Sequence, residues 1–377
     1  RYMSKKILVS GIQPTGRLHI GNYFGAMKQN ISIANNGEYE SYIFLADYHA
    51  LTTVRDGNAL RAQTLEAAAS YIACGLDISK AIIFKQSDVR EVTELTWIFN
   101  NLVTVPYLER GHAYKDKKNK EQEEIKSAMT NFGMSNFDKE LLKKINSENE
   151  DERNQVISQV KNKIGLSDFK TRTNVGLFDY PVLMASDILM YGADIVPVGA
   201  DQKQHVEYAR DIAGYYNRAY NVEEFNLPAD LILLTTGTVP GVDGKKMSKS
   251  YNNHIELFCS DEELKKRVMS IVTDSAAPED KKNANASVIF NIHKLFLDKD
   301  QTEELRAKFE TGGYGYKQAK DELLSTIMLW REGKKEKFDE LMAHPEEHIK
   351  ILEDGGKKAQ KKAEERMKVV RKTVGLS

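Results

Sequence analysis

The chain has 377 residues, enough for two or three domains with a sizeable buried core. Hydrophobic residues at 41% and charged residues at 29% are typical of globular proteins, and no apolar run approaches the ~18 residues of a membrane span. Because 54 basic and 55 acidic side chains nearly cancel, the composition excludes the global positive field of a nucleic-acid coat protein, so any RNA partner must meet local basic patches.

Cysteine content and the absence of targeting signals narrow the protein class further. Cys74 and Cys259 are the only cysteines, too few for a zinc or iron–sulfur site built from thiolates. Nothing in the sequence resembles a signal peptide. We therefore expect a cytoplasmic protein with no membrane partner.

The first third of the chain alternates short apolar runs with helical patterns. The predicted strands cover residues 7–10, 41–46 and 81–84, and the predicted helices residues 19–34, 58–74 and 91–102. This alternation predicts an α/β fold with a doubly wound parallel sheet of Rossmann type, whose ligands bind at the carboxyl ends of the strands. Two polar segments follow predicted strands: residues 11–22 and residues 47–49, Asp-Tyr-His.

The rest of the chain divides into three parts. Residues 118–173 are highly charged with sparse helical periodicity, which predicts a helical insert, although disorder is an alternative for parts of it. The main domain then resumes with an apolar helix, residues 180–191, that has Pro181 at its start, a strand 193–198, a helix 202–212 and a strand 231–234. From Asp261 the pattern is helical to the end. We therefore predict a catalytic domain over residues 3–245, and a mobile lysine loop with an all-α domain over 246–377.

Residues 11–22 form a glycine-rich turn between a strand and a helix. Its glycines permit close backbone approach to a ligand, and the following helix N-terminus favours an anion. His19 is placed to donate a hydrogen bond to a phosphoryl oxygen. The spacing is neither a Walker A motif nor the dinucleotide fingerprint. Taken alone, the segment fits equally well a glycine-rich turn with a solvent-facing histidine.

Residues 244–250, Gly-Lys-Lys-Met-Ser-Lys-Ser, supply the charge that such a turn lacks. Lys246 and Lys249 suit neutralisation of a leaving pyrophosphate, whose charge is stabilised mainly by positioned cations. Lys115 and Lys117 are candidates to supplement them. Mg²⁺ is expected on the phosphates of the nucleotide, since this ion is commonly held by substrate and water. The two segments together predict an ATP site.

Asp187 is the one acidic residue in the apolar helix predicted over 180–191. An unpaired buried carboxylate is costly, so this residue is either paired in the core or functional. Tyr180 and Met184 fall on the same helical face, which favours a ligand pocket over a core cap. Asp47 and His49 are further pocket candidates, although a loop histidine satisfied by its neighbours explains His49 equally well.

Several of these segments resemble known signatures. Leu18-His19-Ile20-Gly21 and Lys246-Met247-Ser248-Lys249-Ser250 are similar to the two signatures of class I aminoacyl-tRNA synthetases. More narrowly, residues 11–16 (GIQPTG), 197–205 (PVGADQKQH) and 272–275 (VTDS) resemble the tryptophanyl-tRNA synthetase family. The likeness runs through nearly the whole chain apart from the insert.

The resemblance implies an enzyme that activates L-tryptophan with ATP and Mg²⁺ and transfers it to its cognate tRNA. It also implies a homodimer whose C-terminal helices read the anticodon. The positions that match the ATP site of the family are Gln13, Pro14, Thr15, Gly21, Asn22, Gly199, Ala200, Asp201, Val239, Lys246, Met247, Ser248, Lys249 and Ser250. Those that match or border the tryptophan site are Tyr180, Met184, Asp187, Gln202 and His49. In that site Asp187 corresponds to the carboxylate that accepts the indole N–H.

The sequence departs from the family pattern at four residues. Asn22 stands where many class I enzymes carry a second histidine, which is usual in this family. Ala200 replaces a residue that is often acidic, which puts one side-chain contact in doubt. Pro240 and Gly241 alter the sequence beside Val239, so the register of its adenine contact is open.

Other interpretations remain. A tyrosyl-tRNA synthetase shares the fold and both signatures, but fits the Met184 context and residues 199–205 less well. A non-catalytic RNA-binding relative is disfavoured by the intact His19, Lys246 and Lys249. A cofactor-forming nucleotidylyltransferase would not explain the C-terminal helices. The lysines at 115–120 and 357–372 are candidate RNA surfaces, and the alternative for each is a solvated helix face.

Overall fold

The structure is a computed structural model that describes residues 5–14, 16–111, 149, 155–156, 174–199, 203–232 and 238–377. The chain divides into two compact units, Arg1–Phe99 with Leu183–Ser377, and Asn100–Val182. The predicted insert, residues 118–173, lies almost wholly outside the described residues. The domain boundary at residues 245 and 246 stays a prediction.

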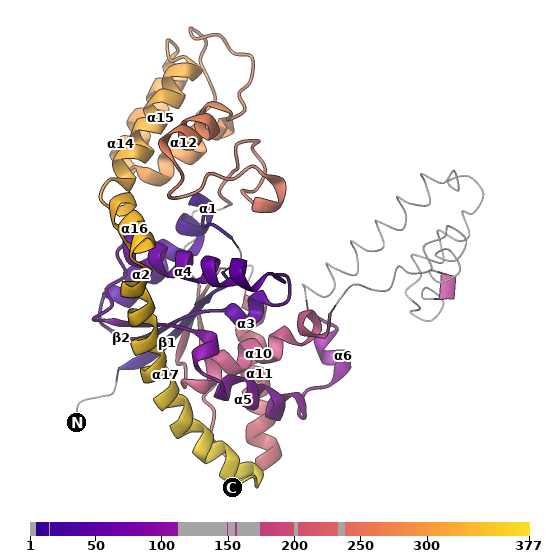
Figure 1. The fold of residues 1–377 in the computed structure, drawn as a ribbon. Coiled ribbons are helices and arrows are strands. Elements are labelled where there is room, and N and C mark those ends of the chain that lie inside the picture. The colour runs from indigo at the N-terminus through magenta and orange to yellow at the C-terminus, as the bar shows by residue number, and fades with distance from the viewer. Residues whose placement is uncertain are drawn as a thin grey trace. The chain divides into compact units, whose positions relative to one another are not determined.

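The first unit contains a five-stranded parallel sheet (Figure 1). Its strands are β1 (Lys6–Ile12), β2 (Tyr39–Leu45), β3 (Ala81–Lys85), β4 (Ile195–Val198) and β5 (Ala229–Ile232). The spatial order β3-β2-β1-β4-β5 confirms the predicted doubly wound α/β fold. The chain runs outward in opposite directions from β1 and β4, so these two strands form the topological switch point where such sheets bind ligands.

Helices of the first unit mostly match their predicted positions. They include α3 (Asp47–Ala50), α4 (Gly57–Ala73) and the part of α5 (Glu91–Asn100) up to Phe99. The continuous helix predicted over 19–34 is instead α1 (Ile20–Asn22), a π-helical turn (Tyr23–Met27) and α2 (Lys28–Asn35). A π-helical turn inserts residues into a helix and is frequent beside functional sites.

Two predicted helix boundaries were wrong. Helix α10 (Val175–Met190) begins before Pro181, which therefore lies inside it. Asn174 explains the earlier start, because its side chain accepts a hydrogen bond from the amide of Leu177 at 2.9 Å, as an N-cap does. Helix α11 (Lys203–Tyr220) extends past residue 212, because its buried face continues through Ala213 and Tyr216.

The helical C-terminal region is confirmed. It comprises α12 (Asp261–Met269), α13 (Val288–His293), α14 (Lys299–Thr311), α15 (Tyr316–Arg331), α16 (Lys334–Ala343) and α17 (Pro345–Val374), with short 3₁₀ turns between them. Helix α16 packs against α4 through a small apolar cluster that includes Ala69 and Phe338.

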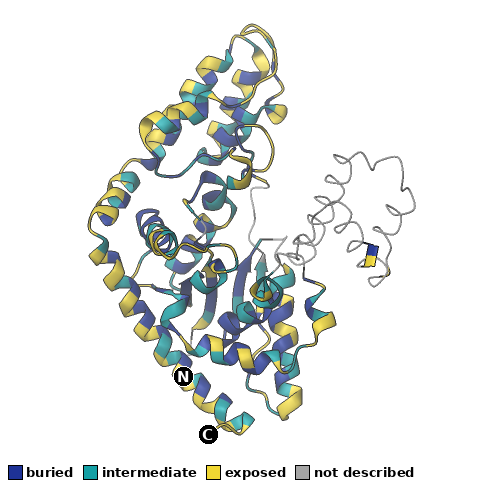
Figure 2. Ribbon diagram, turned by 45° about the vertical axis from the view of Figure 1, so that its right-hand side comes forward, coloured by how far each residue is buried: buried dark blue, intermediate teal, exposed yellow. Residues whose placement is uncertain are grey.

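Helix α17 returns from this region to run along β3 (Figure 1). Two glycines allow the contact: a Cβ at Gly355 would lie 1.9 Å from the carbonyl oxygen of Ile83, and one at Gly356 would lie 2.9 Å from Asp88. Figure 2 shows a buried stripe along α17 with an exposed face opposite. The last helix is therefore fixed to the sheet, with one long face turned to solvent.

Candidate active site

The carboxyl ends of four strands bring polar segments to one edge of the sheet. The glycine turn follows β1, Asp47 and His49 follow β2, Gln86 follows β3, and Gly199 follows β4. The glycine turn and Gly199 stand at the switch point between β1 and β4. The sequence-based prediction of where these segments lie on the sheet is confirmed.

Two glycines of the turn have a steric reason. A Cβ at Gly11 would lie 2.4 Å from the ring of Phe44, so only glycine fits beside β2. Gly16 has a φ of +79°, in the left-handed region that favours glycine. The position of a Cβ at Gly16 is 3.5 Å from the Nζ atom of Lys249. The glycine turn and the lysine loop are therefore next to each other, as predicted.

His19 is buried at the start of α1 and forms a reciprocal cap with Asn22. The Nδ1 atom of His19 accepts from the amide of Asn22 at 3.3 Å, and the side-chain oxygen of Asn22 accepts from the amide of His19 at 3.1 Å. Burial, with the positive charge of Lys249 and the neighbouring His254, lowers the pKa of His19 to about 4. A neutral ring whose Nδ1 is an acceptor carries its proton on Nε2, so His19 is a hydrogen-bond donor at neutral pH.

A short antiparallel pairing ties the segment after the lysine loop to the glycine turn. The amide of Ile20 donates to the carbonyl of Ile255 at 2.9 Å, and the amide of Leu257 donates to that of Leu18 at 3.0 Å. Beside this pairing, Arg17 contacts Glu256 at 3.2 Å. The segment that follows the lysine loop is thus joined to the glycine turn by backbone bonds and by an ion pair.

The lysine loop is a tight hairpin built around the buried Asn253. The Nδ2 atom of Asn253 donates to the Asp243 carboxylate at 2.7 Å and to the carbonyl of Lys246 at 3.1 Å, while its oxygen accepts from the amide of Ser248 at 2.8 Å. A Cβ at Gly241 would lie 2.3 Å from the Asn253 side chain, so the glycine makes room for this bridge. Asn253 therefore fixes the backbone that carries the lysines.

The side chains of the loop differ in exposure. Lys246 is exposed, whereas Lys249 is half-buried. Burial lowers the pKa of Lys249, and the carboxylates of Glu66 and Glu256 oppose that shift. Lys249 is thus held close to the glycine turn, among carboxylates that a polyphosphate would replace as its partners.

Four other residues assigned to the ATP site lie in or beside the same hairpin. Met247 is buried, and its sulfur lies 3.3 Å from the amide nitrogen of Gly21, so its side chain packs beneath the turn. The Ser248 side chain accepts from the amide of Ser250, which caps a 3₁₀ turn. The carbonyl of the buried Val239 accepts from the amide of Met247 at 2.9 Å. These residues shape the loop, and their nucleotide contacts stay predictions.

Asp187 lies in the middle of a hydrogen-bonded network and is 1% exposed. Gln86 donates from its Nε2 atom to both carboxylate oxygens, at 2.9 and 2.7 Å. The Nε2–H of His49 donates to Oδ2 at 2.9 Å. Burial raises the pKa of Asp187, while the bonds from His49 and Gln86 oppose that shift. A carboxylate offers about four acceptor positions, and donors among the described residues occupy three of them.

Gln86 is itself held in one orientation. Its Oε1 atom accepts from the amides of Tyr48 and His49 at 3.1 and 3.4 Å, which leaves Nε2 directed at Asp187. The carbonyl of His49 accepts from the side chain of Gln13 at 3.1 Å. Gln13 belongs to the predicted ATP site, so this bond connects the Asp187 network to the glycine turn.

The other predicted site residues are distributed as follows. Pro14 is buried within the glycine turn, and Met184 is half-buried one helical turn before Asp187. Tyr180 lies on α10 in the second unit. The remaining predictions, Thr15, Lys115, Lys117, Ala200, Asp201 and Gln202, lie outside the described residues.

Sequence reasoning missed the residues that orient the site. Gln86 directly follows β3, so the rule that ligands bind at strand ends, applied to the third strand, would have found it. Asn253 and Glu256 gave no such signal, because their partners lie in a loop geometry and in a strand pairing that only the folded chain reveals.

Neither a metal cage nor a membrane span occurs in the part of the chain that the structure describes. Among the described residues, no group of three or more histidine, cysteine or acidic side chains is placed to hold a metal ion. Among those same described residues, no helix is both long and apolar enough to cross a bilayer.

Comparison with known proteins identifies the family of this chain. Residues 3–137 and 141–329 match the family model described as "tRNA synthetases class I (W and Y)". A tryptophan–tRNA ligase of Fusobacterium nucleatum is 43% identical over 368 residues, which cover 98% of this chain and 97% of the relative. A tryptophan–tRNA ligase of Campylobacter jejuni strain RM1221 is 40% identical over 98% of this chain and 99% of its own.

A solved structure agrees with these sequence matches. The tryptophanyl-tRNA synthetase of Campylobacter jejuni complexed with ADP and tryptophan superposes with a TM-score of 0.78 at 39% identity, covering 98% of this chain and 99% of that chain. The resemblance seen in the sequence motifs is thereby confirmed over the whole chain.

Proposed function

The chain belongs to the class I aminoacyl-tRNA synthetases of the tryptophan and tyrosine group, and from that premise we propose that it is a tryptophan–tRNA ligase. The carboxylate of L-tryptophan attacks the α-phosphorus of ATP, which gives tryptophanyl-adenylate and releases pyrophosphate. The terminal adenosine of the tRNA then takes the acyl group. The protein contributes position and positive charge, and forms no covalent intermediate with the substrate.

At the amino-acid end, Asp187 accepts the indole N–H of tryptophan. Gln86 and His49 donate hydrogen bonds to its carboxylate, and these bonds favour the ionised form against the cost of burial. Phenylalanine offers no donor in this place, and leaving the carboxylate unpaired disfavours it by factors of up to ~10⁴. This network is the observation that carries the assignment of the amino acid.

At the phosphate end, His19 donates from Nε2 to an oxygen of the reacting phosphate. Its pKa of about 4 keeps the ring neutral, so it contributes a hydrogen bond and no charge. Lys249 and Lys246 neutralise the pyrophosphate as it leaves. Mg²⁺ would be held mainly by the phosphates of ATP and by water, and would screen the phosphate charge when bound.

Exchange of labelled pyrophosphate into ATP tests this proposal, with tryptophan, tyrosine and phenylalanine supplied separately. Exchange with tryptophan alone is the expected result. Exchange with tyrosine would keep the ATP site and overturn the role of Asp187. No exchange with any of the three, in folded protein with Mg²⁺, would favour a non-catalytic RNA-binding role.

The tRNA is the second substrate, and its anticodon is read by the C-terminal helices. A cavity of about 860 Å³ beside α14 and α15 supports this part of the proposal. Its lining mixes donors and acceptors, among them Lys308, Gln318 and the buried His293, whose Nδ1 atom has no hydrogen-bond partner among the residues that the structure describes. Such a lining suits the edge of an unstacked base.

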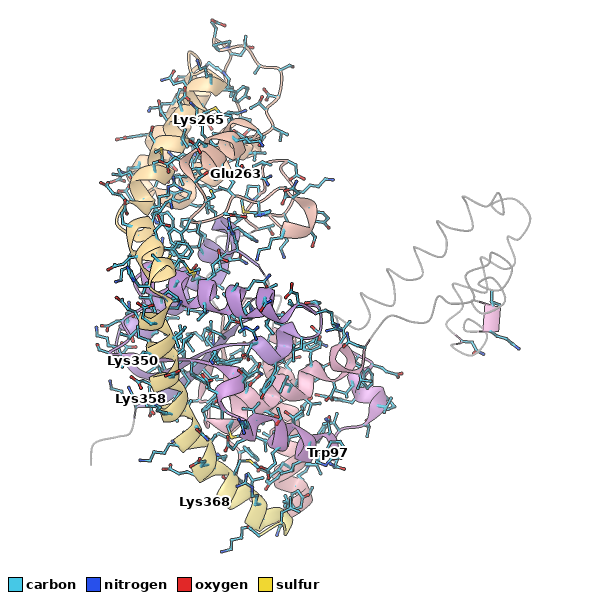
Figure 3. All side chains as sticks on the ribbon, in the orientation of Figure 1. Trp97, Glu263, Lys265, Lys350, Lys358 and Lys368 are labelled. Atoms are coloured by element: carbon cyan, nitrogen blue, oxygen red, sulfur yellow. The ribbon has the colours of Figure 1, made fainter. Side chains whose placement is uncertain are left out.

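The protein acts as a cytoplasmic homodimer. Trp97, on α5, is 70% exposed, and Figure 3 shows it on the outer side of that helix. Exposed tryptophan is typical of protein interfaces. Trp97→Glu should convert a dimer to a monomer in sedimentation-equilibrium measurements, and an unchanged mass would place the interface elsewhere.

A further inference from the structure

We propose that one exposed row of lysines on α17 binds the sugar–phosphate backbone of the tRNA, whatever its sequence. The lysine row consists of Lys350, Lys357, Lys358, Lys361, Lys368 and Lys372. This inference rests on the proposed function, because it names a contact surface for the second substrate.

The geometry of α17 aligns these lysines. At 3.6 residues per turn, all six fall within about 100° of the helix circumference, opposite the stripe that packs on the sheet. From Lys350 to Lys372 the row extends for about 33 Å at 1.5 Å per residue. Figure 3 shows Lys350, Lys358 and Lys368 one after another along the outer side of the helix. The row is a straight track of ammonium groups on a fixed support.

Ion pairing distinguishes this row from the lysines of α16. On α16, Lys335 pairs with Asp339 at 2.7 Å and Lys337 pairs with Glu340 at 2.9 Å. In the lysine row, Lys357 pairs with Asp354 at 3.3 Å, and the other five have no ion pair with any of the residues that the structure describes.

The charge balance of the sector is also unusual for this chain. Six lysines share it with three carboxylates, Glu347, Asp354 and Glu365, although the whole chain has a net charge of −1. Unpaired positive charge concentrated along one line is the footprint of a phosphate-binding surface.

The arginines of the same helix have a different role. Arg366 pairs with Glu224, and Arg371 pairs with Glu94, so both anchor α17 to the rest of the first unit. The fully buried Ala359 and Ala363 lie on the same inner side. Arginine is therefore used inward as an anchor, and lysine outward, where a flexible point charge suits a mobile phosphate chain.

The test compares two matched double variants of the full-length protein. Lys361→Ala with Lys368→Ala removes two unpaired charges from the lysine row. Lys335→Ala with Lys337→Ala removes two paired charges from α16 and serves as the control. Lys361 and Lys368 are exposed, Lys335 and Lys337 are half-buried, and alanine favours helix at all four positions, so both proteins should fold.

The expected result concerns tRNA only. Removing one lysine that binds a phosphate should reduce the slope of log Kd against log salt by about one, so the slope for tRNA falls by about two in the row variant and stays unchanged in the control. The KM for cognate tRNA should rise roughly tenfold in the row variant. The Kd for non-cognate tRNA should rise by the same factor, because phosphates carry no sequence information.

Three outcomes would overturn the inference: equal salt slopes in the two variants, an unchanged KM for tRNA, or loss in the row variant of binding to anionic lipid vesicles but not to tRNA. Tryptophan-dependent pyrophosphate exchange is measured alongside and should be unaffected in both variants. If wild-type protein showed no exchange, the proposed function would fail, while the tRNA salt slopes would still report on the lysine row.

Discussion

The two ends of the candidate active site are held together in different ways. Around Asp187, side chains from three separate elements meet, and each polar atom of the carboxylate has a directed partner. Around Lys249, the backbone determines the arrangement. A hairpin fixed by Asn253 and a short strand pairing place the ammonium group beside the glycine turn. The first arrangement selects by geometry, and the second supplies charge.

This difference predicts which residues determine amino-acid specificity and which determine the reaction rate. A directed acceptor discriminates between ligands that do and do not offer a donor. A cation beside a polyphosphate stabilises whatever charge develops there, irrespective of the amino acid. Variants at one end should therefore alter tryptophan recognition, and variants at the other should alter the rate of adenylate formation.

Lys249→Ala should have the largest effect. Removing a positioned group that stabilises transition-state charge costs roughly 10² to 10³ in kcat. Tryptophan affinity should change little, because the Asp187 network does not involve this residue. Single-turnover adenylation and calorimetric titration of tryptophan measure the two quantities, and equal losses in both would contradict the assigned role.

Asp187→Ala should have the converse effect. It removes the acceptor of the indole N–H and leaves the Gln86 amide and His49 without their partner. A buried unsatisfied group costs about 1–3 kcal/mol, so the KM for tryptophan should rise roughly tenfold to 100-fold. Steady-state exchange kinetics measure it. An unchanged KM for tryptophan would show that Asp187 belongs to the core and not to the pocket.

Gln86→Met sharpens the same comparison with a smaller change. The substitution keeps the side-chain length but removes the two bonds to Asp187, so the carboxylate loses its orientation and part of its stabilisation as an ion. We expect the KM for tryptophan to rise about tenfold, in line with the loss of hydrogen bonds to a charged group. The acid limb of the KM profile should also move to higher pH, a shift that a merely structural role would not produce.

The contrast also explains what the sequence was able to predict. The glycine turn and the lysine loop are each a short segment, so spacing and residue type were sufficient to identify both. Their complementary chemistry in an ATP site then predicted that they lie together. The parallel sheet followed from the alternation of apolar runs, and the strand ends placed Asp47 and His49. Asp187 stood out because a carboxylate in an apolar helix needs a reason.

What the sequence did not reveal depends on contacts between distant segments. Gln86 meets Asp187 across 101 positions, and Glu256 meets Arg17 across 239. The π-helical turn after Asn22 and the position of Pro181 inside α10 also escaped prediction, because propensity and periodicity do not encode either feature. Patterns predicted the groups that we propose for the chemistry, and the fold was needed to find those that orient them.

The smallest expected effect is a difference in pH dependence between the two ends. Burial raises the pKa of Asp187, so this carboxylate gains a proton as pH falls before an exposed one would. Protonation weakens it as an acceptor, and the KM for tryptophan should rise on the acid side. His19, with a pKa lowered to about 4, stays neutral across the range in which an ordinary histidine titrates, so kcat should be flat between pH 8 and about 5.5 as far as His19 is concerned.

Measuring kcat and KM separately over this range distinguishes the two ends, with His19→Asn as the matched variant. If kcat fell as pH rose, with an apparent pKa near 6.5, and this fall disappeared in the variant, His19 would act as an imidazolium. The same histidine also affects stability. Its folded-state pKa lies below that of the unfolded chain, so between about pH 6.5 and 4 the unfolded state binds more protons and the free energy of unfolding falls as pH falls. Urea titrations should show a shallower loss over that window in His19→Asn, because the variant has no proton to gain there.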